Sequence, residues 1–400
     1  MRLRATATLP RAFWALWVCQ LVNRLGGFVQ PFLVLYLTQE RHLSASTAGA
    51  VVAAVGVGSV TSEFVGGWLT DRIGRRHTML IGFLATAAAL IALGQATSMP
   101  VIWATSFAVG LTSDMFRPAV QATVADLLGP TERVRAYGLL FWAINLGFSI
   151  STVSAGVLSR VGYGLLFWLN AATSVIAALI IWRMVPETRP ALPDSGRRAL
   201  LPVAARDITL LLVISINIVY AAIYFQGYST LPLVMADDGL ATATYGLVIA
   251  LNGVVIVLAQ PFAVRLLGKR DRSVVLAVSM LTVGLGFGLG AVVHEWWGYA
   301  ASVVVWTFGE IGFATVFGAI VADLAPVDLR GGYMGLTGTA FGFGSIIGPL
   351  LGTRVLDAAG GDAVWTACAV LGVVLFAAQV ALAPTLRRRS ALAEAVPVPT

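Results

Sequence analysis

The sequence predicts an all-α membrane protein in which twelve transmembrane helices form two pseudo-symmetric six-helix bundles. Three observations support this prediction: the composition, the length of the apolar segments and an internal repeat. Of the 400 residues, 58% are hydrophobic and only 11% are charged, whereas soluble globular chains carry about 25% charged residues. A chain with so few charges has too little polar surface to face water on all sides, so we expect most of it to lie in lipid.

Apolar segments follow one another along the whole chain, and short loops separate them. Each segment is long enough to cross a bilayer, which takes about 20 helical residues. Backbone polar groups in lipid must bond within their own segment, so segments of this length are expected to be helices. The expected spans are 12–38, 46–70, 78–97, 100–127, 136–159, 163–184, 207–235, 241–266, 273–294, 298–323, 332–357 and 362–384. An even number of spans places both termini on the same side.

The basic residues indicate which side that is. With a cytoplasmic N-terminus, 21 of the 26 Lys and Arg residues fall in cytoplasmic segments, three fall outside and two lie inside helices. Cytoplasmic loops of membrane proteins are enriched in Lys and Arg, so this split predicts a multi-pass protein of the cell (inner) membrane with both termini in the cytoplasm. The formal net charge of +7 therefore indicates topology, and we expect no nucleic-acid partner.

An internal repeat divides the chain almost in half. The sequence VADL occurs at 124–127 and again at 321–324, an offset of 197 residues, and Arg133, Gly138 and Gly147 have counterparts at the same offset. We therefore expect an N-terminal bundle over 1–184, a cytoplasmic linker over 185–206, a C-terminal bundle over 207–384 and a cytoplasmic tail over 385–400. Two parallel repeats of this kind place a binding site near the membrane midplane where they meet.

The loop after the second span reads GWLTDRIGRR, residues 67–76. This resembles the G-x-L-x-D-R-x-G-R-[KR] signature of the major facilitator superfamily, and the resemblance implies the major facilitator fold with a cytoplasmic gate. In that gate Asp71 would lie near the N-terminus of a neighbouring helix, and the arginines would pair with Asp126. The implied gating residues are Gly67, Asp71, Arg72, Gly74, Arg75, Arg76 and Asp126. The alternative is that the arginines only fix topology. The second half has a degenerate copy, RLLGKR, at 265–270.

Further segments resemble a narrower group within that superfamily. The fifth span keeps the glycine spacing of drug/proton antiporters with substitutions, and Gly344, Gly348, Pro349 and Gly352 in the eleventh form a better copy. The chain therefore resembles bacterial multidrug/proton antiporters of the first, twelve-helix, drug-antiporter family. Close helix packing is the alternative explanation for such glycines. The first span is also similar to a motif of proton-coupled oligopeptide transporters, in which the amides of Gln20 and Asn23 replace two acids.

Charged side chains inside the spans are the first candidates for function, because each costs about 2.5–3.5 kcal/mol near the bilayer centre. Arg24, Asp114, Arg117 and Glu310 fall near the midplane, and Glu63 lies about two turns from the cytoplasmic end of its span. Asp114 and Arg117 are three residues apart on one helix, so we expect a salt bridge that keeps the aspartate ionised. Glu310 has no basic neighbour within a turn of its own helix, so it is the stronger candidate for a proton carrier, ahead of Asp114 and Glu63.

Polar and aromatic side chains recur at helical spacing on the spans that would line a cavity. The expected substrate-binding residues are Asn23, Arg24, Arg117, Gln121, Trp142, Asn145, Tyr220, Tyr224, Glu310 and Phe313. For any single aromatic residue, helix packing remains the alternative. With Arg24, Arg117, Glu63, Asp114 and Glu310 all ionised, the charges sum to −1, which favours lipophilic cations or zwitterions.

The sequence contains no motif typical of an enzyme, a cofactor site or a metal site, so we expect none of these. The glycines at 284, 286, 288 and 290 fall inside a predicted span with no preceding strand, so they do not form a phosphate loop. The two cysteines lie in apolar segments. We therefore expect a monomeric transporter whose partners are a small-molecule substrate, protons and membrane lipids. Three functions remain open: proton-coupled export of amphipathic small molecules, proton-driven uptake of peptide-like or other nutrients, and a lipid flippase or non-transporting receptor.

Overall fold

The computed structural model describes residues 9–188, 200–267, 270–326 and 329–395, and its described part is helical without strands. Half of the predicted linker (189–199), two residues of the second-half motif (268–269) and the end of the tail (396–400) lie outside the described residues. The chain divides into two compact units, one made of residues 1–30 and 57–193, the other of residues 31–56 and 194–400. Residues 31–56 thus group by their contacts with the second unit, although the sequence places them in the first half.

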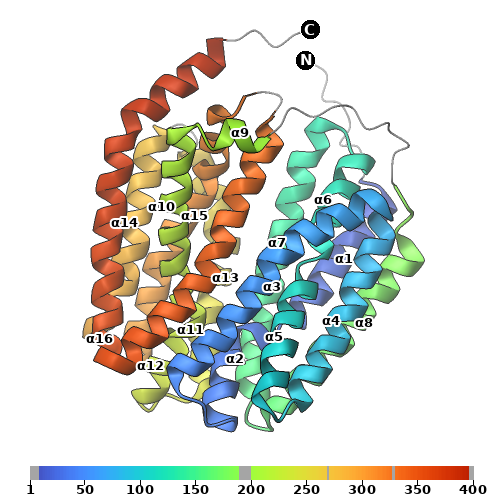
Figure 1. Cartoon of the computed structure of the whole chain (residues 1–400), viewed down its shortest axis with the longest axis vertical. Helices are drawn as coiled ribbons and strands as arrows, with labels where there is room; N and C mark the ends of the chain where they lie inside the picture. Colours follow the sequence, from blue (N-terminus) through green and yellow to red (C-terminus); the bar gives the residue numbers. More distant parts are fainter. Residues whose placement is uncertain (1–8, 189–199, 268–269, 327–328, 396–400) are drawn as a thin grey trace. The chain divides into compact units, whose positions relative to one another are not determined.

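The first unit contains α1 (Arg11–Leu25), most of α3 (Ala45–Arg72), α4 (Arg75–Gln95), α5 (Met99–Ser113), α6 (Phe116–Leu127), α7 (Pro130–Leu158) and α8 (Tyr163–Met184). Within it, α1 packs against α7 and α8, while α4 packs against α5, α6 and α8. Its apolar core includes Phe13, Leu16, Phe83, Phe116 and Ile181, which are almost completely buried. Figure 1 shows α4 and α8 side by side.

The second unit begins with most of α2 (Val29–Leu35) and a π-helical turn (Tyr36–Glu40). It continues with α9 (Leu200–Ala204), α10 (Ile208–Tyr224), α11 (Gln226–Ser229), α12 (Leu231–Asp237), α13 (Thr242–Leu267), α14 (Arg272–Gly288), a 3-10 turn (Leu289–Val292), α15 (Trp296–Leu324) and α16 (Arg330–Ala395). Helices α10, α14 and α15 all pack against α16, as Figure 1 shows within this unit.

Ten helices of the described chain are long and apolar enough to cross a membrane. The predicted span 100–127 is not one of them, because its helix breaks at Asp114 and Met115 into α5 and α6. The predicted spans 332–357 and 362–384 form one element, α16, which is interrupted at Gly360 (φ 80°, ψ 176°) and continues to Ala395 in the predicted tail. A positive φ of this size favours glycine. The all-α multi-pass fold is confirmed, and the count of twelve spans stays a prediction.

The glycines at 284, 286, 288 and 290 have a packing role that the sequence did not identify. A Cβ added at Gly284 would lie 2.4 Å from the Cα of Gly372, and one at Gly286 would lie 2.6 Å from the backbone N of Trp306. Side chains at these positions would push α14 away from α15 and α16. Small residues at such contacts let membrane helices approach closely, so this run is a packing surface.

Candidate functional site

The loop between α3 and α4 carries the predicted gating motif, and Arg75 is its most buried arginine. The Arg75 guanidinium donates from Nε to Asp126 Oδ2 at 3.0 Å and from Nη1 to the Thr70 carbonyl at 3.1 Å. Its Nη1 also lies 3.8 Å from Asp71 Oδ1, and the Arg75 side chain is only 10% exposed. A charge this buried needs both an anion and hydrogen-bond acceptors, and Asp126 and Thr70 provide them.

The N-terminus of α4 holds an anion that the sequence did not predict. The Glu187 carboxylate accepts hydrogen bonds from the backbone N–H groups of Arg75 at 2.8 Å and Arg76 at 3.1 Å, and it lies 3.4 Å from His77 Nδ1. A helix N-terminus has unsatisfied N–H groups and a positive dipole end, which favour a carboxylate. Gly74, with φ 101°, turns the chain so closely that a Cβ there would meet this carboxylate.

The resemblance places Asp71 near the N-terminus of a neighbouring helix. Its side chain is 76% exposed, with Arg75 as its nearest described ion partner, and that placement stays a prediction. Among the described residues of this unit, Glu187 supplies the anion at the N-terminus of α4. The signal for Glu187 in the sequence was weak, because the residue lies in the linker, more than 100 positions from the helix that it caps.

The other predicted gating residues are more exposed. Arg72 lies over the ring of Trp68, with its Cζ 5.1 Å from the ring centroid. Arg76 donates a hydrogen bond to the Trp182 carbonyl. No described atom lies within 4 Å of a Cβ built on Gly67, whereas one built on Gly66 would lie 2.5 Å from the Met115 carbonyl. Within the first unit Gly66, and not Gly67, therefore makes the close helix contact.

The second unit contains the counterpart of the Arg75–Asp126 pair. The offset of 197 residues relates Arg75 to Arg272 and Asp126 to Asp323. Arg272 Nη1 lies 2.6 Å from Asp323 Oδ2. The repeat of the motif is thus visible in this ion pair, although the sequence comparison at 265–270 found only a degenerate copy.

The N-terminus of α14 also has a capping carboxylate, which comes from the residue directly before the helix. Asp271 Oδ1 accepts from the backbone N–H groups of Ser273 at 2.9 Å and Val274 at 3.1 Å. Its Oδ2 lies 2.7 Å from Arg387 Nε. Partial burial raises the pKa of Asp271, but the hydrogen bonds from Val274 and Arg387 outweigh that effect and hold the pKa below its usual value.

The intramembrane charges of the first unit form a cluster at the break between α5 and α6. Arg117 Nε lies 3.2 Å from Asp114 Oδ1, and its Nη1 lies 3.8 Å from Glu63 Oε1 on α3. The side chains of Arg117 and Glu63 are 45% and 44% exposed, and that of Asp114 is 23% exposed. One guanidinium thus serves two carboxylates, and the sequence predicted only the contact with Asp114.

The remaining predicted binding residues of the first unit lie on α1, α6 and α7. Arg24 and Asn23 are half-buried in the last turn of α1, and a Cβ on Gly147 would lie 2.7 Å from the Cβ of Arg24. Trp142 is 41% exposed and Asn145 is 8% exposed. The Asn145 amide donates to the Phe141 carbonyl of its own helix at 2.9 Å.

Gln121, on α6, is exposed. The predicted binding residues of this unit therefore range from exposed to almost fully buried.

Glu310 lies in the middle of α15, which is continuous across this position. Its Oε2 accepts a hydrogen bond of 2.6 Å from Asn252 Nδ2 on α13, and the Tyr224 hydroxyl at the end of α10 also lies within interaction range. Asn252 Nδ2 donates to Thr307 Oγ1 as well, at 3.0 Å. Within the described residues no ion pair involves Glu310. Asn252 was not among the predicted site residues, because it is uncharged and lies 58 positions away on another helix.

Aromatic rings surround the position of Glu310. Tyr220 and Phe313 are stacked with ring centroids 4.0 Å apart and an interplanar angle of 7°, and Phe313 stacks on Phe317 at 4.5 Å. Tyr224 contacts Trp306 edge to face at 5.9 Å. The second unit thus brings together Glu310, Tyr220, Tyr224 and Phe313, all four of its predicted binding residues, in one cluster.

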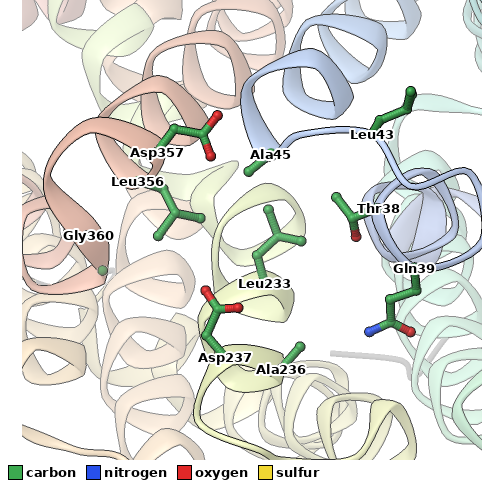
Figure 2. Close-up of a pocket in the computed structure, with 11 residues that line it drawn as sticks. Thr38, Gln39, Leu43, Ala45, Leu233, Ala236, Asp237, Leu356, Asp357 and Gly360 are labelled. Atoms are coloured by element: carbon green, nitrogen blue, oxygen red, sulfur yellow. The ribbon is translucent and has the colours of Figure 1, made fainter.

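A separate cavity of about 520 Å³ lies in the second unit and contains none of the predicted site residues. Figure 2 shows Thr38 and Gln39 on one side of it and Asp237 and Asp357 on the other. Asp357 Oδ2 accepts from the backbone N–H of Ser46 at 2.7 Å, so this carboxylate caps the start of α3. The cavity is therefore distinct from the Glu310 cluster, and one of its acids has a structural partner.

Comparison with known proteins places this arrangement in a family. The model of the Major Facilitator Superfamily matches residues 16–236 and 212–399, which together cover nearly the whole chain. The chain belongs to the Major Facilitator Superfamily. Its resemblance to that superfamily, first seen in the loop at 67–76, is thereby confirmed.

Relatives within the superfamily are distant in sequence. The chain is 27% identical to the uncharacterized MFS-type transporter YqjV of Bacillus subtilis, over 86% of both chains. It is 26% identical to multidrug resistance protein 2 of the same organism, over 83% of this chain and 85% of the relative. Among solved structures, a POT family transporter in complex with 5-aminolevulinic acid superposes with a TM-score of 0.81 at 15% identity, over 96% of this chain and 98% of the other. This structural likeness shows the fold alone.

Proposed function

We propose that this superfamily member is a proton-coupled exporter of amphipathic small molecules, with lipophilic cations as the preferred class. The observation that carries the proposal is Glu310, a carboxylate in the middle of a membrane helix with no ion pair in the described structure and with aromatic rings around it. A carboxylate in that setting is costly to keep charged unless a proton or a cation neutralises it.

The proposed coupling follows from that cost. Glu310 binds either a proton or the cationic substrate, so the two exclude one another and exchange across the membrane. The half-buried ring of Tyr224 suits a lipophilic cation, because aromatic rings attract cations that have lost part of their water. Tyr220 and Phe313 are buried and stacked on one another, so they line the site as an apolar wall. Trp306 is fully buried, so its role is to support the ring of Tyr224.

The charges of the first unit take a different role in this proposal. Asp114 is paired with Arg117, and Glu63 shares the same guanidinium, so neither carboxylate is as ready to exchange a proton as Glu310. We assign Asp114 and Arg117 to the framework of the site and Glu63 to a secondary proton position. Arg24, Asn23, Gln121, Trp142 and Asn145 are proposed to contact the substrate.

The cytoplasmic motif is proposed to act as a gate during transport. In this proposal the protein lies in the cell membrane with both termini in the cytoplasm. Arg75, Asp126 and Glu187 then hold the ends of α4, α6 and α8 together. Asp71 and Arg72 are exposed at this gate, and their contacts are proposed to change during the transport cycle.

The relatives support export more than uptake. Multidrug resistance protein 2, whose name refers to resistance against many drugs, aligns over most of this chain. The POT family likeness concerns the fold, and in this chain the first span has Gln20 and Asn23 where the peptide transporter motif has acids. Peptide uptake is therefore the second outcome to be tested and not the proposal.

The test uses purified protein in proteoliposomes with an imposed pH gradient. Tetraphenylphosphonium, a lipophilic cation, is the probe, and a neutral dipeptide is the comparison. We expect the gradient to drive tetraphenylphosphonium against its concentration gradient in exchange for protons. Glu310→Gln imitates the protonated side chain in size and hydrogen bonding, so it should abolish gradient-driven movement, and any exchange of substrate for substrate that remains should no longer depend on pH.

The matched control is Glu295→Gln, which changes an exposed glutamate at the start of the same helix. This variant should couple like the parent. Dipeptide accumulation without movement of the cation would replace the proposal with uptake of peptide-like nutrients. Undiminished coupling in Glu310→Gln would remove Glu310 from the mechanism.

A further inference from the structure

Asn252 is a buried amide at the contact between α13 and α15, and the proposed function does not use it. Its side chain is 2% exposed. Both hydrogens of its amino group point to α15, one to Glu310 Oε2 at 2.6 Å and the other to Thr307 Oγ1 at 3.0 Å. An amide so buried costs stability unless its polar groups are bonded, so its orientation is a strong constraint on the site.

The hydrogen bonds around Thr307 fix which way this amide faces. The Thr307 hydroxyl donates its own hydrogen to the Val303 carbonyl at 2.6 Å. Its oxygen can therefore only accept from Asn252, and an ionised carboxylate can also only accept. The amino group of Asn252 must then face α15, and its carbonyl oxygen must face away.

This orientation distinguishes the two charge states of Glu310. The ionised carboxylate accepts from Asn252 and lies beside the Tyr224 hydroxyl, so it is well stabilised. The neutral carboxyl has a hydrogen to donate, and the amino group of Asn252 cannot accept it. A flip of the Asn252 amide would supply an acceptor, but Thr307 would then have to give up its bond to Val303.

Within the part of the chain that the structure describes, the other elements packed against α15 supply no competing charge near Glu310. On α10 the titratable groups that face Glu310 are Tyr220 and Tyr224, with the Tyr228 hydroxyl 3.2 Å behind that of Tyr224. On α14 the contact is made by Ser279 and Val283 against Gly309 and Gly312. From α16, Phe341 contacts Tyr224. In the described structure the short donor to Glu310 is thus the amide of Asn252.

We propose that Asn252 is a positioning residue: oriented by Thr307, it holds the ionised Glu310 carboxylate in place and sets the pH at which that carboxylate gives up its proton to bind substrate. This inference rests on the proposed function of Glu310. It adds a specific role for α13, a helix in which the sequence alone marks no functional residue.

The experiment measures the affinity for tetraphenylphosphonium as a function of pH in the detergent-purified full chain. In the parent, binding should weaken as the pH falls through a midpoint, because the proton then occupies Glu310. Asn252→Leu keeps the size of the side chain and removes the donor. A hydrogen bond to a charged group has a strength that corresponds to about one to two pH units, so the midpoint should move up by about that amount.

Two more variants test the charge next to Glu310 and the orientation of the Asn252 amide. Asn252→Asp places a second carboxylate next to Glu310, so the pair must share a proton and the midpoint should move further in the same direction. Thr307→Val removes the acceptor that orients the amide and leaves both Asn252 and Glu310 in place, so it should give a smaller upward shift. This variant also keeps the inference testable if Asn252→Leu does not fold.

The matched control is Asn217→Leu. Asn217 is another buried amide of the same unit, 1% exposed, whose Nδ2 donates to the Thr337 carbonyl at 2.8 Å and not to Glu310. Its removal should leave the midpoint unchanged.

Different results would overturn the proposed function of Glu310 and the proposed role of Asn252. Glu310→Gln should remove the pH dependence of binding altogether, and a retained midpoint in that variant would overturn the proposed function. If Glu310→Gln loses the midpoint but Asn252→Leu and Thr307→Val keep that of the parent, only the role of Asn252 is overturned. A midpoint that moves equally in Asn217→Leu would also refute it.

Discussion

The ion pairs Arg75–Asp126 and Arg272–Asp323 occupy equivalent positions in the two repeats, yet they differ in burial. The Arg75 side chain is 10% exposed, whereas that of Arg272 is 44% exposed, and both aspartates are 22% exposed. Replacing each arginine by alanine therefore compares the same chemistry in two environments. We expect Arg75→Ala to destabilise the first unit more than Arg272→Ala destabilises the second.

The magnitudes follow from what each substitution leaves behind. Removing one partner of a fully buried ion pair costs about 3–5 kcal/mol. Asp126 keeps some water contact and a hydrogen bond from Thr188 Oγ1 at 3.0 Å, so we expect the low end, about 3 kcal/mol, for Arg75→Ala. The guanidinium of Arg272 is screened by solvent, which limits the cost of Arg272→Ala to about 1 kcal/mol or less.

The two cysteines provide the assay. Cys19 is 1% exposed in the first unit and Cys368 is 4% exposed in the second, so a thiol-reactive dye reaches each only after local unfolding. Measured on heating in detergent, Cys368→Ala protein reports the first unit and Cys19→Ala protein reports the second. For units of this size about 1 kcal/mol shifts Tm by about 2–4 °C, which predicts a loss of about 6–12 °C for Arg75→Ala and about 2–4 °C or less for Arg272→Ala.

Equal losses in the two variants would refute the reasoning, because burial would then not determine the value of the pair. A large loss seen equally by both cysteines would mean that the units unfold together, and the comparison would have to be made on total stability. Arg72→Ala is the control within the motif. It removes a half-exposed contact with the Trp68 ring and should cost about 0.5–1 kcal/mol.

Two further predictions concern packing and acid stability. Gly284→Ala should lower the thermal stability of the second unit, measured at Cys368, because its Cβ would lie 2.4 Å from the Cα of Gly372. Gly335→Ala is the control, since no described atom lies within 4 Å of its Cβ, and it should leave that stability nearly unchanged. Equal effects of the two variants would contradict the packing role of the glycine run. Asp271→Ala removes a capping carboxylate and should cost about 1 kcal/mol near pH 7. Because the pKa of Asp271 is lower in the folded protein, its carboxylate stabilises the fold fully above the unfolded pKa of about 3.9. This stabilisation is lost as the pH falls through the lower folded pKa, so the parent and the variant should have the same stability at acid pH. A stability difference that persists unchanged at low pH would show that the charge of Asp271 does not matter.

The sequence predicted the features that depend on composition and on local spacing. The all-α membrane fold followed from the lack of charge, and the family followed from ten consecutive residues at 67–76. The contact between Asp114 and Arg117 followed from a separation of three residues on what was expected to be one helix. In the structure the contact survives even though the helix breaks between them, because the Arg117 backbone N–H still bonds to the Asp114 carbonyl at 3.0 Å.

Three of the contacts that the sequence missed join distant segments. Glu63 reaches Arg117 from another helix, and Glu187 caps a helix more than 100 residues earlier in the chain. The donor to Glu310 comes from Asn252 on a neighbouring helix. Helical spacing shows which residues share a face, but it does not show which face of another helix lies opposite. A single sequence therefore identifies the charged members of a site more easily than the neutral partner that controls them.

The positions of the charges along their helices explain why Glu310 needs such a partner. Arg24 lies in the last turn of α1, and Asp114 lies at the break between α5 and α6. At these interruptions, backbone groups without helical partners and the water that reaches them can stabilise a charge. Glu310 lies inside the continuous helix α15, where the backbone groups are already bonded. Its charge therefore depends on side chains from other helices. In our proposal, this dependence lets a neutral amide on α13 determine when the charge of Glu310 changes.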